Sequence, residues 1–151
     1  MQFIRAIEQE EAALVGFGIR VLLLTRQPLD GPIVRRLAGL GGRVAVAEEL
    51  FTALSTVIDD PVEFGLFVID CDSLGGIEVG RKAFAMLGET VRRVPVILIS
   101  AECQQQRFPD SRDAATELRA PLSSVSLRVG FEHALRDRLA ARMIGNLHKA
   151  A

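Results

Sequence analysis

Three polar residues stand at the ends of apolar runs, where they could do chemistry. Asp70 and Asp72 follow the apolar run 65–69, and Ser100 closes a second apolar run that begins at Pro95. A carboxylate fixed at the end of a buried strand is a candidate reactive group, and Asp72 supplies a second carboxylate two residues later. Whether Asp70 reacts or only caps the next turn depends on which residues the fold brings beside it.

Buried strands must carry these residues. The run 65–69 has no polar interruption and is followed by Gly75 and Gly76, which is typical of a strand buried on both faces of a parallel sheet. Its first carboxylate should therefore emerge at the C-terminal end, where open α/β sheets place their ligand crevices. Similar patterns predict further strands at 20–25, 43–46, 95–100 and 116–120.

Amphipathic stretches between these strands predict the helices. Apolar residues recur at helical spacing over about 33–40, 50–58 and 79–91, and again from Leu127 to Met143. Asp30 and Ser123 or Ser124 are candidate N-caps, whereas 104–110 has no apolar face and is expected to be a loop or a short helix.

Strands that alternate with helices predict a doubly wound, three-layer α/β/α sandwich with a parallel sheet. With right-handed crossovers, five strands fit the flavodoxin-like order 2-1-3-4-5 best. We expect one domain over 19–140, with an N-terminal helical extension over 1–18 and a C-terminal helix extension over 141–151.

Composition narrows the possible partners and compartments. The chain has 151 residues and a formal net charge of −1, so nothing favours nucleic acid or an anionic membrane. Acidic residues near the N-terminus are unlike a signal peptide, which leaves the cytoplasm as the expected location. Cys71 and Cys103 have no framework spacing and are expected to be reduced thiols.

The strand ends carry a recognisable set of positions. The predicted order brings together Thr25, Arg26, Asp70, Ser100, and Ala120 with Pro121. This set resembles the receiver domains of response regulators, the CheY-like family, over about residues 20–139. The resemblance implies that Asp70 stands at the phosphoacceptor position, Ser100 at the hydroxyl position, and Pro121 in a Lys-Pro turn.

The chain departs from the family at the positions that make the acceptor reactive. The resemblance places the family's acidic pair on Thr25 and Arg26 and its lysine on Ala120. The Mg²⁺ of the family would then have only Asp70 and Asp72 as weak candidate ligands, and the family uses the position of Asp72 through its backbone carbonyl. The family's switch aromatic falls near Glu117. We therefore expect no required cofactor and weak or no phosphorylation at Asp70.

Arg26 offers a replacement for the lost charges. A guanidinium at this position could pair with Asp70 by charge-assisted hydrogen bonds, in place of both Mg²⁺ and the missing lysine. The alternative is that Arg26 is a solvated loop charge. Likewise, Asp70 is either a weakened acceptor or an inert carboxylate, and Ser100 either lines the site or only bonds nearby backbone.

The resemblance implies a stand-alone, degenerate receiver (a pseudo-receiver) in two-component phosphorelay signalling. It would not be an enzyme, and it would act by contact with a signalling protein such as a histidine kinase or a downstream regulator. Apolar surface beyond the receiver core predicts a homodimer; it comes from the first helix (Phe3, Ile4, Ile7) and from the end of the last helix (Met143, Ile144, Leu147). The alternative is a small Mg²⁺-dependent phosphatase, because Asp70-Cys71-Asp72 also resembles the Asp-x-Asp motif of the haloacid-dehalogenase type.

Overall fold

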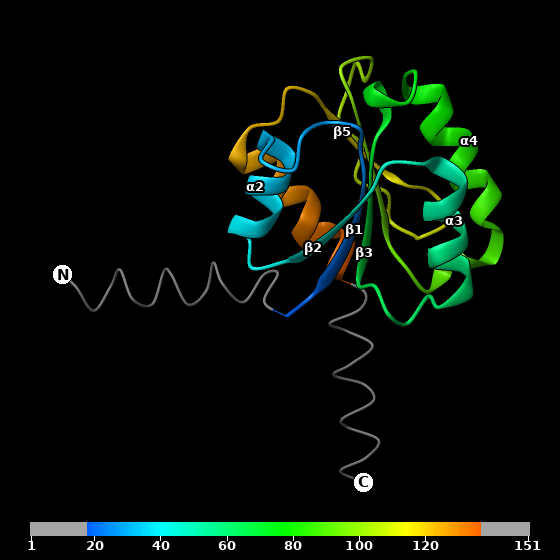
Figure 1. Ribbon diagram of the computed structural model, residues 1–151. Coiled ribbons are helices and arrows are strands. Elements are labelled where there is room, and N and C mark those ends of the chain that lie inside the picture. The colour runs from blue at the N-terminus through cyan, green and yellow to red at the C-terminus, as the bar shows by residue number, and fades with distance from the viewer. Residues whose placement is uncertain (1–17, 137–151) are drawn as a thin grey trace, which may run out of the picture.

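A five-stranded parallel sheet forms the centre of the computed structural model, which describes residues 18–136 (Figure 1). The strand order is β2-β1-β3-β4-β5, which confirms the predicted 2-1-3-4-5 order. The strands are β1 (Arg20–Leu24), β2 (Arg43–Ala47), β3 (Leu66–Asp70), β4 (Val96–Ser100) and β5 (Thr116–Arg119). Parallel register pairs Leu24 with Ile69 and Asp70 with Ile99, so the C-terminal ends of β1, β3 and β4 meet at one edge.

Helices cover both faces of this sheet. They are α2 (Pro32–Gly39), α3 (Leu50–Asp59) and α4 (Ile77–Leu87), with short 3₁₀ turns η1 (Cys71–Ser73) and η2 (Gly88–Arg92). A C-terminal helix begins at residue 124 and continues to 136, where the described part of the chain ends. The predicted extensions over 1–18 and 141–151 lie outside the described residues, apart from Gly18.

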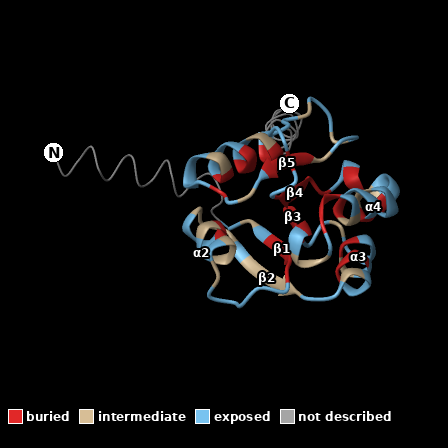
Figure 2. Ribbon diagram, turned by 90° about the horizontal axis from the view of Figure 1, so that it is seen from above, coloured by how far each residue is buried: buried red, intermediate tan, exposed pale blue. Residues whose placement is uncertain are grey.

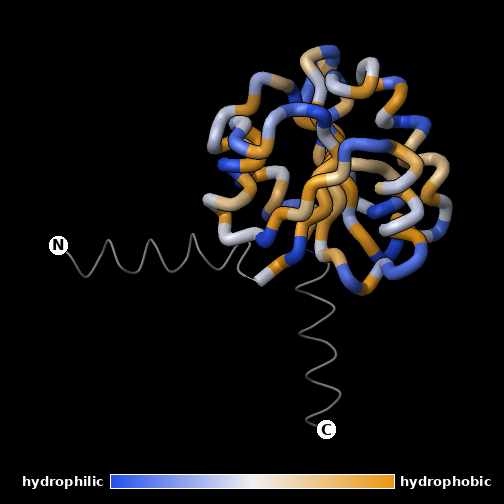
Figure 3. The backbone as a smooth tube through the Cα atoms, viewed as in Figure 1, coloured by the Kyte–Doolittle hydropathy of each residue, from blue (hydrophilic) through white to orange (hydrophobic). Residues whose placement is uncertain are grey.

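Apolar side chains separate into two cores, one on each face of the sheet. On one face, Leu22, Phe67 and Leu98 pack with residues of α3 and α4. On the other, Val68 and Ile97 pack with residues of α2 and of the C-terminal helix. Figure 2 shows the buried residues along the strands and on the sides of the helices that face the sheet. Figure 3 shows that the central strands are largely hydrophobic. This double burial explains the unbroken apolar runs in the sequence.

Several predicted boundaries shift by a residue. Strand β1 ends before Thr25, and β4 begins after Pro95, which has no N–H to donate to a ladder. The N-cap of α2 is Gly31 and not Asp30, although Pro32 occupies the first turn as expected. Ser123 caps the C-terminal helix, because its Oγ accepts the N–H of Ser126 at 3.0 Å.

The connection from β4 to β5 is a loop over residues 101–115, which contains the segment 104–110 for which the sequence predicts a loop or a short helix. One antiparallel bridge holds this loop to β5: the N–H of Arg107 donates to the carbonyl of Glu117 at 2.8 Å, and the reverse bond is 3.0 Å long. Among the described residues, no helix is long and apolar enough to cross a membrane.

Candidate functional site

Asp70 lies at the C-terminal end of β3, in the crevice that the sheet topology predicts. Its side chain is almost completely buried, with the residue only 3% exposed. The hydroxyl of Thr25 donates a hydrogen bond to Oδ2 of Asp70 at 2.8 Å. The carboxylate is therefore held by a neutral donor from the end of β1.

The predicted ion pair between Arg26 and Asp70 is wrong. Nε of Arg26 donates instead to the carbonyl oxygen of Glu48 at 3.4 Å, and its backbone N–H donates to Oγ of Ser73 at 3.1 Å. The reason lies one residue earlier, where the N–H of Thr25 bonds to the carbonyl of Ala47 at 2.9 Å. This continues the β1–β2 pairing and turns Thr25 inward, so that Arg26 lies on the outer side of the crevice.

Asp72 makes the contact that the sequence did not reveal. Its Oδ1 accepts the hydroxyl of Ser100 at 2.5 Å, and its Oδ2 accepts the N–H of Ala101 at 2.8 Å. The first distance falls in the range of charge-assisted O–H···O⁻ bonds. Asp72 thus acts through its side chain, and not through its backbone carbonyl as the resemblance implied.

A cavity of about 350 Å³ opens beside the two carboxylates. Asp70, Asp72 and Ala101 are among the residues that line it. The other lining residues come from the loop after β1, from α2 and from the turn after β5: Gln27, Pro32, Ile33, Arg36, Ala120, Pro121 and Leu122. The structure therefore gathers Asp70, Asp72, Ala120 and Pro121 around one space, into which α2 brings the cation of Arg36.

The donor set at this edge does not fit a Mg²⁺ ion. Within residues 18–136, no group of three or more His, Cys, Asp or Glu side chains could hold a metal. Asp70 and Asp72 are each engaged by protein donors, and Thr25 contributes a hydroxyl at a position where the resemblance implies a carboxylate. A Mg²⁺ ion would have to compete with the donors that already hold these carboxylates, which are Thr25 for Asp70 and Ser100 with Ala101 for Asp72.

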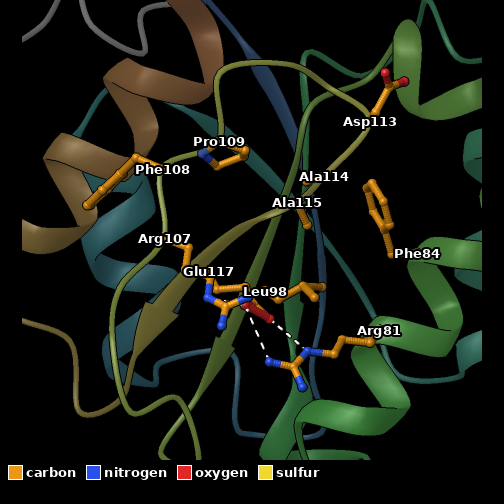
Figure 4. A pocket seen from close by; sticks show the side chains of 10 residues that line it. All are labelled: Arg81, Phe84, Leu98, Arg107, Phe108, Pro109, Asp113, Ala114, Ala115 and Glu117. Atoms are coloured by element: carbon orange, nitrogen blue, oxygen red, sulfur yellow. Dashed lines mark hydrogen bonds and ion pairs between the residues drawn. The ribbon is translucent and has the colours of Figure 1, made fainter.

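A second, larger cavity lies away from Asp70, between α4 and the loop 101–115, with a volume of about 500 Å³ (Figure 4). Glu117 of β5 lies in its wall with a side chain only 8% exposed. Nε of Arg81 donates to Oε1 of Glu117 at 2.9 Å, and Arg107 approaches the same carboxylate at 3.8 Å. A buried, paired carboxylate therefore occupies the position where the resemblance expected an aromatic residue.

Both cysteines are buried free thiols, in keeping with the expected reduced state. Burial raises the pKa of the Cys71 thiol to about 12, so this thiol is protonated at neutral pH. Its reactivity is correspondingly low, because the thiolate is the nucleophile. Cys71 is a packing residue between β3 and α4.

No family model matches the sequence, and no curated protein matches it either. Solved structures do match the fold. A response regulator receiver domain protein from Clostridium thermocellum is 14% identical with a TM-score of 0.64, covering 82% of this chain and 98% of that chain. The receiver domain of a sensor histidine kinase from Pseudomonas aeruginosa, crystallised with magnesium in its active-site cleft, is 18% identical with a TM-score of 0.57, covering 78% and 98%.

The response regulator PhyR from Brucella abortus is 17% identical with a TM-score of 0.63. The match covers 97% of this chain and 60% of PhyR, so this chain spans only part of that protein. The phosphatase alternative finds no support, since these matches are receiver proteins and Asp72 is bound to Ser100 and Ala101. At identities this low the likeness establishes architecture: the chain has the fold of response-regulator receiver domains.

Proposed function

We propose that the chain is a receiver-like signalling module that acts by protein–protein contact, with weak or no phosphorylation at Asp70. The observation that carries this proposal is the pairing of Asp70 with Thr25. At the edge where the magnesium-binding receivers need further carboxylates, a hydroxyl donates to the buried carboxylate at 2.8 Å. Phosphoryl transfer depends on positioning and on charge stabilisation, and Ala120 supplies no cation beside the carboxylate.

The proposed signalling role requires a protein partner, and the structural neighbours suggest its class. Structural neighbours include a receiver domain of a sensor histidine kinase and the response regulator PhyR, which is described in Bartonella quintana as an anti-anti-sigma factor. A histidine kinase or a downstream regulator is accordingly the class of partner that we propose. We place the protein in the cytoplasm, without a catalytic activity of its own.

We also propose a homodimer, because apolar residues of the predicted first helix extend beyond the receiver-like domain. The mass of the full chain in solution, measured by light scattering, should correspond to a dimer. Deletion of residues 1–14 should then yield a monomer. A monomeric full chain would contradict the proposed dimer.

The phosphorylation claim is tested by mass spectrometry of the intact full-length chain. The protein is incubated with Mg²⁺ and acetyl phosphate, beside Asp70→Asn and beside a receiver domain that has a complete acidic pair. We expect the reference receiver to gain one phosphoryl group while this chain gains none. Stoichiometric modification of the wild-type chain that disappears in Asp70→Asn would contradict the proposal.

A further inference from the structure

The end of β4 directs two hydrogen-bond donors at one carboxylate. The hydroxyl of Ser100 and the N–H of Ala101 contact different oxygens of Asp72, at 2.5 Å and 2.8 Å. Ser100 is completely buried, whereas Asp72 is the exposed residue of the 3₁₀ turn that follows β3. The contact therefore joins the ends of two neighbouring strands through a side chain that reaches in from the surface.

The hydroxyl of Ser100 is fixed in direction by its neighbours. Its Oγ accepts the N–H of Glu102 at 3.1 Å, which leaves the hydroxyl hydrogen free to point at Asp72. The carbonyl oxygen of Ser100 accepts the N–H groups of Cys103 at 3.3 Å and Ala120 at 3.1 Å. These bonds preorganise the first residues of the loop 101–115 around Ser100, so the two donors form a rigid pair that suits an anionic acceptor.

We propose that Asp72 serves as a built-in anion: it occupies the donor pair of Ser100 and Ala101, fixes the start of the loop 101–115, and excludes external oxyanions. The inference rests on the proposed function and deepens it, because it names the contact that would hold the start of the loop in the absence of phosphorylation. The cavity of about 350 Å³ that borders Asp72 and Ala101 provides a route by which a phosphate-like oxyanion would reach the donors once Asp72 is removed.

The test uses inorganic phosphate as the probe and the backbone amide signal of Ala101 as the readout, in the ¹⁵N-labelled full chain. For the wild type we expect no saturable shift. In Asp72→Ala, the Ala101 signal should move before any phosphate is added, because its acceptor is gone, and phosphate should then shift it saturably. The affinity of the variant for phosphate should exceed that of the wild type by at least about tenfold.

Two controls separate the donor pair from a simple change in charge. Asp59→Ala removes one exposed carboxylate at the last residue of α3 and should behave as the wild type. Asp72→Ala combined with Ser100→Ala keeps the lower charge but deletes one donor, and should lose the phosphate response. Asp72→Gly, which also removes the carboxylate and empties the donor pair, gives the same comparison if Asp72→Ala does not fold.

Three results would overturn the inference: an equal phosphate response in the wild type, no response in the Asp72 variants, or an undiminished response in the double variant. None of these bears on acetyl phosphate labelling of Asp70, which tests the proposed function separately. Phosphorylation of wild-type Asp70 by acetyl phosphate would refute the proposed function. The role of Asp72 would still be decided separately, by the response of the Ala101 amide signal to inorganic phosphate.

Discussion

The hydroxyl of Thr25 lies 2.8 Å from Oδ2 of Asp70, and both residues are almost fully buried, at 1% and 3% exposure. The bond joins the end of β1 to the end of β3 across the crevice. A buried carboxylate needs such a donor, because leaving it unpaired carries a large desolvation penalty. Thr25 thus stabilises the Asp70 carboxylate, which belongs to no cluster of metal-binding side chains among the described residues.

Replacement of Thr25 by Val, which has nearly the same shape, should lower the free energy of unfolding by about 1.5–3 kcal/mol, the range for hydrogen bonds to charged groups. Urea denaturation at neutral pH measures the change. Thr25→Ser keeps the hydroxyl and should lose much less stability. Equal stability of the Val variant and the wild type would show that the bond to Asp70 does not matter.

Gly80 of α4 packs against Cys71 with no room for a side chain. A Cβ at position 80 would lie 2.3 Å from Sγ of Cys71 and 3.4 Å from Cδ2 of Leu98. Gly80→Ala should therefore lower the free energy of unfolding by about 1–3 kcal/mol through overpacking, although Ala is the better helix former. Chemical denaturation of the purified variant measures this loss.

A double-mutant cycle identifies the source of that loss. Cys71→Ala removes Sγ, so Gly80→Ala should be much less harmful in that background. Gly39→Ala in α2 is the matched control, because a Cβ there meets nothing within 4 Å. The control should be neutral or slightly stabilising. A loss at position 80 that is independent of Cys71 would contradict the packing explanation.

Burial of the Cys71 thiol predicts a dependence of stability on alkaline pH. Its pKa is raised from 9.0 to about 12 in the folded chain. Above pH 9 the unfolded thiol ionises while the folded one does not, so the unfolded state binds fewer protons and stability falls as pH rises toward 12. The loss approaches about 1.4 kcal/mol per pH unit for one thiol.

The measurement is the difference in free energy of unfolding between the wild type and Cys71→Ala, taken at pH 8, 9, 10 and 11. The chain contains no tyrosine, so few other groups titrate in this window. Burial also raises the pKa of the Cys103 thiol, and the difference cancels that contribution because both proteins retain Cys103. A difference that stays constant over this pH range would mean that the Cys71 thiol ionises as easily in the folded chain as in the unfolded one.

The sequence predicted the sheet, its order and the position of Asp70, because strands buried on both faces leave unbroken apolar runs and their ends are set by topology. It did not predict the contacts among the polar residues there. The direction of Arg26 depends on whether the N–H of Thr25 continues the pairing with β2. The contact of Asp72 with Ser100 depends on the turn after β3 and on the spacing of two strand ends, which no local pattern encodes.

The central claim is that Asp70 stands at the phosphoacceptor position but does not accept a phosphoryl group. Titration of the full-length chain with beryllofluoride in the presence of Mg²⁺ tests this claim most directly. Backbone amide signals of Asp70, Ser100 and Ala101 are followed by NMR. The structure predicts no saturable shift. Thr25 already bonds to Asp70, and Asp72 already bonds to Ser100 and Ala101. The described residues also contain no group of three or more His, Cys, Asp or Glu side chains that could hold a metal ion. Saturable shifts at Asp70 that require Mg²⁺ and vanish in Asp70→Asn would show a working acceptor and contradict the account.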